Sequence, residues 1–493
     1  MQRRTPGPMP PPTPTPKRTR WLPALLLAAC VLGLAGAGAT ALFLQSKGVT
    51  PRALAPYVEK RSSGHNNTIV GIGKWSEAAL MRLDRGVPGT SLAEFPGIGA
   101  QRTGTANPPG SERLVGTVEE LRGAVASAEP GDVITLMPGA YRIARTSVAI
   151  TRAGRENAPV VVRARLPGSV EIAVDTSIGF AVGAPYWRFE NLSIRGVCSQ
   201  HQFCEHAFQV TGAGHHFAAR NNTIVDFNAH FKVNGVDGRV PDAGLIESNT
   251  LRNDTVRNTA TPVTPIDLVA ASGWSIRRNL IADFVKGHGD RISYGAFAKG
   301  GGAGNVFEQN AVVCEARLRG APGQRVGLSL GGGGTGPAYC RDRRCVVEQE
   351  GGVLRSNLVA SCSDDGVYLN NAAATRMEHN TIIDTGGVQV RFAASSADIE
   401  GNLIDGGIRS SDGGVLRLND NRSTGIALLY AGYHPNRSVF VNAGDFNFAW
   451  SGQAPRRSVA SKAPDLCGTL RPAKPAYGAF EDFAPCMKAA AKP

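Results

Sequence analysis

The sequence predicts an all-β protein: a right-handed parallel β-helix (solenoid) with a helical cap at its N-terminal end, preceded by a single transmembrane helix. Two observations carry the β-helix prediction. A short phrase, an asparagine beside an apolar strand, recurs along most of the chain, and many of the 60 glycines flank short runs of valine, isoleucine and leucine. Glycine suits tight turns between short strands, which disfavours helix-rich folds.

The recurring asparagines set the period of the fold. They are Asn191, Asn222, Asn249, Asn279, Asn310, Asn357, Asn380 and Asn402, with spacings of 31, 27, 30, 31, 47, 23 and 22 residues. Such spacings are typical of a solenoid in which loops enlarge some coils. An asparagine at a corner tolerates a left-handed backbone and can bond to the coils above and below, so we interpret the ladder as structural. The two-residue alternation between asparagines argues against helical repeats.

A helix is predicted over residues 117–128, just before the first coils. Thr117-Val-Glu-Glu120 forms a capping-box pattern, and Val118, Leu121 and Val125 fall on one face. The helix is expected to end at Pro130-Gly131. Because a solenoid needs its open apolar end covered, we expect this helix to be the cap.

The chain divides into five expected segments. Residues 1–20 form a basic, proline-rich cytoplasmic tail, residues 21–45 a transmembrane signal anchor, and residues 46–110 a neck or linker with a short helix near residues 74–83. Residues 111–450 form the β-helix, and residues 451–493 a cysteine-containing tail.

The N-terminal segment predicts a single-pass protein of a bacterial-type inner membrane. Residues 1–20 hold five cations and no anion, and the next 24 residues, Trp21 to Leu44, are uncharged. That length spans a bilayer, and cationic flanks stay in the cytoplasm, so the β-helix should face the periplasm. A lipoprotein is the alternative, since Leu27-Ala-Ala-Cys30 resembles a cleavage box. The apolar run, however, continues for 14 residues past Cys30.

Charge narrows the class of partner. The formal net charge is +13, and the remainder is +8 without the five N-terminal cations. Such a surface suits acidic polysaccharides or lipid headgroups, although a solvated basic surface with no polyanionic partner is equally compatible. No cluster of basic residues interleaved with aromatics lies outside the anchor, so we expect no nucleic-acid partner.

The cysteines predict disulfides in an oxidising compartment. Eight remain when Cys30 is set aside, and their irregular spacing does not suit a zinc site. Cys314 and Cys362 lie four and five residues after the asparagines of consecutive coils, so they nearly stack and should pair. The remaining expected pairs are Cys198–Cys204, Cys340–Cys345 and Cys467–Cys486.

Two stretches of the sequence resemble a known protein family. Residues 118–141, which read VEELRGAVASAEPGDVITLMPGAY, and residues 157–168, which read NAPVVVRARLPG, resemble the opening of the chondroitinase B and alginate lyase family of polysaccharide lyases. The order of elements stays similar through about residue 400. The resemblance implies β-elimination at a uronic acid: calcium or another cation neutralises the carboxylate, a lysine removes the ring proton, and an arginine one coil later assists.

Alignment of the strands before each asparagine gives two outward columns with neighbours about 5 Å apart. One column holds Gln209, Lys232, Asp267, Phe297, Ser329, Tyr368 and Gln389, and the other Thr211, Asn234, Val269, Lys299, Gly331, Asn370 and Arg391. Lys299 matches the position of the family's base. Gly331 stands where the assisting arginine would be, and Ile292 and Tyr294 replace the acidic calcium ligands. We therefore expect no metal ligands and no cofactor, although the resemblance itself would allow calcium.

These columns predict the site. Lys299 is the expected proton acceptor, Tyr368 the proton donor, and Arg391 or Lys232 the group that neutralises the substrate carboxylate. The expected catalytic residues are Lys299, Tyr368 and Arg391, and the expected substrate-binding residues are Lys232, Asn234, Asp267, Ser329 and Asn370. The predicted function is binding, with cleavage by β-elimination, of an acidic polysaccharide.

Two alternatives stay open. Asp364-Asp365-Gly366 and Gly287-His288-Gly289-Asp290 resemble motifs of pectin-type hydrolases, and two carboxylates can serve as acid and base in an inverting hydrolysis. The histidine motif here precedes the aspartate pair, the reverse of the order in those hydrolases. A non-catalytic glycan-binding or envelope scaffold is the second alternative, and it accounts most simply for the missing arginine and calcium ligands.

Overall fold

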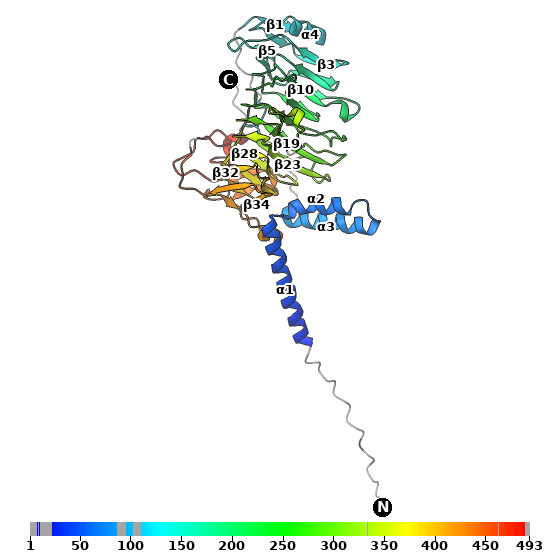
Figure 1. The fold of residues 1–493 in the computed structure, drawn as a ribbon, viewed down its shortest axis with the longest axis vertical. Coiled ribbons are helices and arrows are strands. Elements are labelled where there is room, and N and C mark those ends of the chain that lie inside the picture. The colour runs from blue at the N-terminus through cyan, green and yellow to red at the C-terminus, as the bar shows by residue number, and fades with distance from the viewer. Residues whose placement is uncertain are drawn as a thin grey trace, which may run out of the picture.

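The computed structural model describes residues 7, 9, 22–85, 95–101, 110–332, 334–461 and 463–488. Between residues 112 and 423 the chain winds into a right-handed parallel β-helix, which confirms the predicted fold class (Figure 1). Three long parallel sheets run along the solenoid, with 12, 11 and 10 strands. We call them sheet 1, sheet 2 and sheet 3 in that order.

Each sheet collects one short strand from successive coils. Sheet 1 contains β1 (Glu112–Val115), β2 (Val133–Leu136), β5 (Val160–Ala164), β8 (Trp187–Glu190), β11 (Ala218–Arg220), β14 (Leu245–Glu247), β17 (Ser275–Arg277), β21 (Val306–Glu308), β25 (Val353–Arg355), β29 (Thr375–Glu378), β32 (Ser396–Glu400) and β35 (Val415–Asn419). Sheet 2 contains β3 (Gly139–Ala144), β6 (Val170–Asp175), β9 (Ser193–Gly196), β12 (Thr223–Val225), β15 (Thr250–Arg252), β18 (Leu280–Ala282), β22 (Ala311–Val313), β26 (Leu358–Ala360), β30 (Thr381–Ile383), β33 (Leu403–Ile404) and β36 (Arg422–Ser423). Sheet 3 contains β4 (Val148–Ile150), β7 (Ile178–Val182), β10 (His206–Thr211), β13 (Ala229–Asn234), β16 (Ile266–Val269), β19 (Ile292–Lys299), β23 (Gln324–Leu330), β27 (Val367–Asn370), β31 (Gly387–Arg391) and β34 (Gly407–Ser411).

Smaller elements complete the fold. A three-stranded sheet joins β20 (Gly302–Ala303), β24 (Gln349–Glu350) and β28 (Ala372–Ala373), and β37 (Phe440–Asn442) pairs antiparallel with β38 (Asn447–Trp450). The α-helices are α1 (Leu22–Lys47), α2 (Pro51–Ser62), α3 (Asn67–Arg85), α4 (Val118–Ala126) and α5 (Ile426–Tyr430). Short 3₁₀ turns occupy His201–Phe203, Pro337–Tyr339, Ala443–Asp445 and Ala484–Met487.

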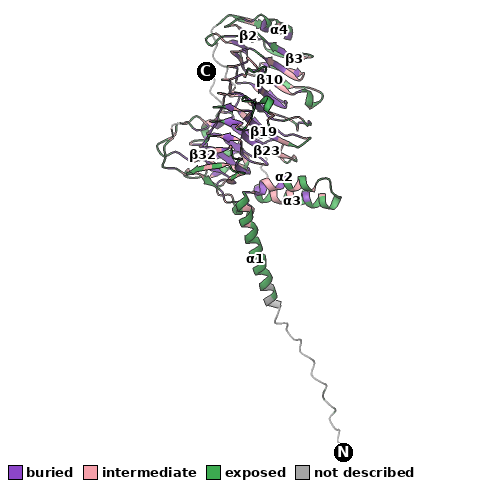
Figure 2. Ribbon diagram, viewed as in Figure 1, coloured by how far each residue is buried: buried purple, intermediate pink, exposed green. Residues whose placement is uncertain are grey.

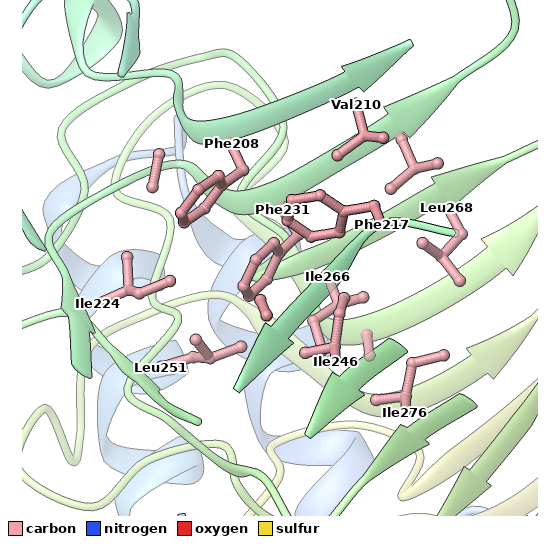
Figure 3. Close-up of a cluster of buried hydrophobic side chains, with 14 of the residues drawn as sticks. Phe208, Val210, Phe217, Ile224, Phe231, Ile246, Leu251, Ile266, Leu268 and Ile276 are labelled. Atoms are coloured by element: carbon pink, nitrogen blue, oxygen red, sulfur yellow. The ribbon is translucent and has the colours of Figure 1, made fainter. Parts of the chain in front are cut away.

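The interior is filled by stacked apolar side chains, which Figure 3 shows for the middle coils. Phe208 and Phe231, on β10 and β13, stack with ring centroids 5.3 Å apart, and Phe180 of β7 stacks on Phe208 at 5.1 Å. All three are fully buried. Burial of aromatic side chains is among the largest apolar contributions a core can receive, so the outward residues are left for other roles.

The asparagine ladder joins the corners between sheet 1 and sheet 2. Asn310 is fully buried; its side-chain oxygen accepts from the Asn279 backbone N–H at 3.1 Å, and its amide donates to the carbonyl of Ile276 at 2.9 Å. The amide also donates to Asn357 at 3.0 Å, so each coil is bonded to the next. The ladder extends one coil beyond the prediction, because Asn421 bonds Asn402 in the same way.

One detail of the predicted ladder is wrong. The left-handed residue is the one that precedes the ladder asparagine, as at Ser248, Arg278 and Gln309. Asn191 itself takes this conformation, and Leu192 occupies the ladder position of that coil, where its backbone N–H donates to Asn222. The asparagine is used for its side-chain bonds, and the preceding residue makes the turn.

Both ends of the solenoid are covered. At the N-terminal end, α4 buries Val118, Leu121 and Val125 on the first coil, and the Thr117 hydroxyl accepts from the Glu120 N–H at 3.1 Å, as the capping pattern predicts. At the C-terminal end lie α5 and the α2–α3 hairpin. The region expected to hold one short helix near residues 74–83 therefore holds two longer ones.

The coils end earlier than the expected residue 450. After β36 the chain forms α5 and then folds back along the outside of sheet 2. Phe440, Phe448, Phe480 and Phe483 of this tail pack together with Leu358 and other outward residues of that sheet. The tail thus covers the later coils of sheet 2, whereas the outward face of sheet 3 carries the pocket described below.

Helix α1 stands apart from the solenoid, and its described side chains are almost all exposed (Figures 1 and 2). Within it, Leu27–Lys47 is long and apolar enough to cross a membrane. The predicted cytoplasmic tail, except for residues 7 and 9, lies outside the described residues. Cys30 is unpaired and exposed in α1, while the other eight cysteines form the four predicted disulfides.

Candidate active site on the outward face of sheet 3

The register of sheet 3 reproduces the two outward columns. Gln209 pairs with Lys232, Lys232 with Asp267, Asp267 with Phe297, and the series continues through Ser329, Tyr368 and Gln389. In the other column Val269 pairs with Lys299, and Asn370 with Arg391. The alternation of short strands was therefore enough to place these residues on one face, although their side chains divide into separate groups.

The first group is an ion pair on β13 and β16. Lys232 donates to Asp267 at 2.7 Å, and Asp267 is nearly buried. Asp267 is an expected substrate-binding residue, and the structure engages one of its two oxygens with Lys232. The second oxygen of Asp267 and the side-chain oxygen of Asn234 have no hydrogen-bond partner among the described residues. Both oxygens are buried, so the part of this group that reaches the surface is the partly exposed side chain of Lys232.

Lys299 forms the second group. Its Nζ lies 4.4 Å from the centre of the Phe297 ring, a cation–π contact, and its stem lies beside Gly332. A side chain at position 332 would meet the Cδ of Lys299, so glycine at this position leaves room for the lysine. Ser329, which we expected to bind substrate, is buried, and its hydroxyl donates to the carbonyl of Gly331 at 3.0 Å. That assignment is corrected, because Ser329 does not reach the surface.

The third group lines a pocket of about 390 Å³ over the last coils of sheet 3. The lining residues are Ile292, Tyr294, Gln324, Val326, Asp364, Asp365, Tyr368, Gln389, Arg391, Arg409, Ser411 and Asp412. Tyr368 and Arg391 thus lie together in one pocket. Lys299 is not among the lining residues.

Tyr368 is held by two neighbours. Asn370 donates to the Tyr368 hydroxyl oxygen at 2.9 Å, and Arg391 also hydrogen-bonds to the phenol. Arg391 in turn donates to Asp412 at 2.6 Å. Burial raises the pKa of Tyr368, partly opposed by Arg391, so the phenol is protonated at neutral pH. Asn370 is buried and positions Tyr368 in place of the expected contact with substrate.

An aspartate pair forms the floor of the pocket just before β27. Arg409 on β34 donates to Asp365 at 2.5 Å and to the carbonyl of Gly386 at 2.8 Å. Asp364 accepts from Gln324 at 3.1 Å. Burial, and then the charge of Asp365, raise the pKa of Asp364 to about 7. Burial also raises the pKa of Asp365, and Arg409 opposes that rise.

Tyr294 closes the other side of the pocket from β19. Burial raises its pKa, and the nearby Tyr368, Asp364 and Asp365 add to the rise, so it too is a neutral phenol. The pocket therefore combines a carboxyl that titrates near neutrality, two phenols and two guanidinium groups. Groups with pKa values shifted by burial and by a specific charged neighbour are typical of functional sites.

The sequence predicts no role, or a different one, for four of these residues: Tyr294, Asp364, Asp365 and Arg409. In the sequence Tyr294 stands only as a departure from the calcium ligands, and the aspartates only as a motif of hydrolases. Arg409 lies one coil beyond the two predicted columns. The signal for it was present, since Gly407-Ile-Arg-Ser-Ser411 repeats the pattern of Gly387-Val-Gln-Val-Arg391 one coil later, and the structure pairs Gln389 with Arg409.

Calcium does not fit the residues at this site. Calcium prefers several oxygen ligands, with carboxylates prominent among them, whereas Ile292 and Tyr294 occupy the positions of the acidic ligands that the resemblance implies. Asp365 is already paired with Arg409. No group of three or more His, Cys, Asp or Glu side chains arranged to hold a metal ion occurs in the part of the chain that the structure describes.

A comparison with known protein families finds a match over the first coils of the solenoid. The sequence model described as Chondroitinase B matches residues 115–256. This region resembles chondroitinase B. The match includes α4 and the first coils and ends before Lys299, Tyr368 and Arg391, so it does not reach the pocket. No curated protein matches the chain.

Several solved β-helix lyases are similar in structure at low identity. Pectate lyase Pel9A has a TM-score of 0.41 and 15% identity, with 80% of this chain and 99% of that one covered. The polysaccharide lyase family 6 enzyme Pedsa3628 from Pseudopedobacter saltans has a TM-score of 0.31 and 15% identity, with 63% of this chain and 92% of that one covered. An alginate lyase from Paenibacillus sp. str. FPU-7 has a TM-score of 0.33 and 15% identity, with 63% of this chain and 99% of that one covered. Similarities this low do not assign an activity.

Proposed function

We propose that this protein binds an acidic polysaccharide along the outward face of sheet 3 and cleaves it by β-elimination in the pocket between β19 and β34. One observation carries the proposal: a single pocket holds a carboxyl with a pKa of about 7, neutral phenols and arginines. Elimination at a uronic acid needs a base, a proton donor and a group that stabilises the substrate carboxylate, and each is present.

Asp364 is the base in this proposal. A carboxylate with a pKa near the working pH is both partly ionised and basic enough to take a proton, which is the best compromise for general base catalysis. Asp364 removes the proton on C5, next to the substrate carboxylate. The electrons of that C–H bond form the C4–C5 double bond, and the C4–O4 bond breaks.

Tyr368 is the proton donor to the leaving O4. Its phenol is neutral and is held by Asn370 and Arg391. Arg391 is about half exposed and stabilises the negative charge that develops on the substrate carboxylate. Asp364 afterwards releases its proton to water and Tyr368 regains one, so the cycle closes without a cofactor or oxidant.

Lys299 is the competing base, and the resemblance is what supports it. Its position over Phe297 lies outside the pocket, next to the Lys232–Asp267 pair. In our proposal Lys299 and Lys232 contact the acidic groups of neighbouring sugar units, which extends the binding surface along sheet 3. Replacement of Lys299 should then weaken binding more than it slows cleavage.

Hydrolysis is a second candidate, favoured by the aspartate pair. Asp364 carries a raised pKa and Asp365 pairs with Arg409, an asymmetry that suits an acid and a base in one site. Hydrolysis adds water across the glycosidic bond and leaves no double bond in the product. The two reactions are therefore distinguished by their products.

We further propose that α1 anchors the protein in the inner membrane with the solenoid in the periplasm. The apolar span Leu27–Lys47 and the four disulfides support this location. Cleavage before Cys30 is the alternative, and the mass of the mature N-terminus distinguishes the two.

The proposed activity is tested with full-length protein in detergent and a panel of acidic polysaccharides, with calcium or with a chelator. Ultraviolet absorbance reports unsaturated uronate, and a reducing-end assay reports all cleavage. We expect absorbance and reducing ends to rise together, with the chelator present. If reducing ends rise without ultraviolet absorbance, the reaction is hydrolysis and the elimination proposal is wrong. If neither signal rises but the polysaccharide still binds, the protein is a non-catalytic scaffold.

A further inference from the structure

The α2–α3 hairpin joins the membrane helix to the solenoid. Only residues 48–50 separate α1 from α2. Arg52 of α2 is fully buried, and its Nε donates to the carbonyl of Cys362 at 2.9 Å and lies 3.6 Å from Asp384. Figure 1 shows the hairpin projecting sideways where α1 meets the last coils, across the direction of α1. The start of the hairpin is therefore fixed to the C-terminal end of the solenoid.

The two sides of α3 face different surroundings. One side faces the solenoid, where Ala78 and Met81 line a groove together with Glu315 and Arg325. Ile72 and Leu83 lie about half a turn around the helix from Met81. On that outer side Ile69, Ile72 and Leu83 are 41%, 60% and 43% exposed, and Trp75 beside them is 72% exposed. An apolar stripe of this size on a helix indicates a partner.

The charges of the hairpin are arranged by sign. The cations Lys60, Arg61, Lys74 and Arg82 are exposed, whereas none of the acids Glu59, Glu77 and Asp84 is. Glu59 lies 3.8 Å from Arg291, and Asp84 is buried against Arg437. What the hairpin presents to its surroundings is therefore cationic and apolar.

We propose that the outer side of α3 lies in the headgroup region of the same bilayer that α1 spans, with Ile69, Ile72, Trp75 and Leu83 at the acyl boundary. This inference rests on the proposed anchoring by α1. A helix with an exposed apolar stripe is typical of interfacial segments, and tryptophan favours that depth. Lys74 lies on the Met81 side of α3 and Arg82 also lines the groove, so the exposed Lys60 and Arg61 at the end of α2 are the cations that contact lipid phosphates. Continuity with α1 places the helix beside the membrane.

The consequence is a fixed orientation. With one transmembrane helix alone, the solenoid could tilt about the residues between α1 and α2, whereas a second contact through α3 removes that freedom. The last coils, which carry the pocket, then stay close to the membrane surface, because Arg291 just before β19 contacts Glu59 of α2. The polysaccharide would be cleaved next to the bilayer.

The test uses full-length protein in vesicles of phosphatidylethanolamine and phosphatidylglycerol, with a nitroxide label on one cysteine. Cys30 is the native free thiol and reports on α1 itself. In a Cys30→Ala background, Ile72→Cys reports on the outer side of α3, and Ala78→Cys, on the groove side, is the matched control. The measured quantity is collision with oxygen, which concentrates in lipid, relative to a water-soluble nickel chelate.

We expect oxygen to dominate at Cys30 and at the Ile72→Cys label, and the nickel reagent to dominate at the Ala78→Cys label. A label at position 72 that collides with nickel as often as the one at position 78, while Cys30 stays in lipid, would overturn the inference and leave the anchor standing. Nickel access at Cys30 would overturn both. Protection of position 72 from both reagents in dilute detergent would assign the stripe to a second copy of the chain and would also overturn it.

Discussion

Two polar rows run along this solenoid, and they differ in how regular they are. The asparagine ladder repeats one residue from coil to coil, from Asn222 to Asn421, and each internal member makes the same bonds. The outward column of sheet 3 changes its residue in every coil, from Lys232 through Asp267, Phe297 and Ser329 to Tyr368. Both rows follow the same strand spacing.

This difference in regularity distinguishes a row of residues that stabilises the fold from a row that is available for binding or catalysis. A row whose members satisfy one another has no capacity left for a ligand, and Asn310 illustrates this with its bonds to Asn279, Ile276 and Asn357. The outward column instead leaves Lys232 and Tyr368 partly exposed, each with a different partner, Asp267 for Lys232 and Asn370 for Tyr368. Regularity thus indicates stability, and its loss indicates a site.

The largest effect on stability is expected in the ladder. Asn310→Ala removes one hydrogen bond each from the Asn279 backbone N–H, the Ile276 carbonyl and the side-chain amides of Asn279 and Asn357 in a buried corner, at a cost of about 4 kcal/mol. Asn421→Ala, at the partly exposed end of the same ladder, should cost about 1 kcal/mol. Denaturant unfolding of both variants measures the contrast, and equal losses would show that position in the ladder does not matter.

In the pocket the largest effect on activity is expected at Asp364. Asp364→Asn keeps the shape and removes the base, so unsaturated product should form about 10²- to 10⁴-fold more slowly. Binding of the polysaccharide should be nearly unchanged. The matched control is Asp398→Asn, an exposed aspartate on sheet 1 paired with Arg417. A variant at Asp364 that retains parental activity would remove this residue from the mechanism.

Next come the proton donor and the competing base. Tyr368→Phe should slow cleavage about 100-fold without weakening binding, because it removes only the hydroxyl. Lys299→Ala should weaken binding several-fold and leave the turnover of bound substrate close to that of the parent. The reverse outcome, with turnover lost at Lys299 and kept at Tyr368, would return the role of base to the lysine.

The smallest effect is expected at the Lys232–Asp267 pair. The pair is partly exposed, so its contribution to folding is about 1 kcal/mol or less. Lys232→Ala should weaken polysaccharide binding a few-fold, and the loss should shrink as salt is raised, because screening already weakens a surface charge contact. Binding measured at two salt concentrations tests this, and an effect independent of salt would show that Lys232 acts through the fold.

The sequence alone predicted most of the fold, because the asparagine spacing and the two-residue alternation are local signals that the solenoid repeats. The same signals placed Lys232, Tyr368 and Arg391 on one face. These signals did not predict which residues on that face contact each other. The pairing of Lys232 with Asp267, and of Lys299 with the Phe297 ring, depends on side-chain conformation. The aspartates precede β27 in a turn, outside the alternation, so their position beside Tyr368 required the folded chain.

The most direct test of the account is the initial rate of unsaturated uronate formation between pH 5 and pH 9. The base must be ionised, and the pKa of Asp364 is raised to about 7, so the rate should be low at pH 5 and rise to a plateau above pH 8 with its midpoint near pH 7. In the Asp364→Asn variant the rate should stay low at every pH, while circular dichroism shows an unchanged fold. A rate independent of pH across this range, or the same midpoint in the Asp364→Asn variant, would contradict the central claim.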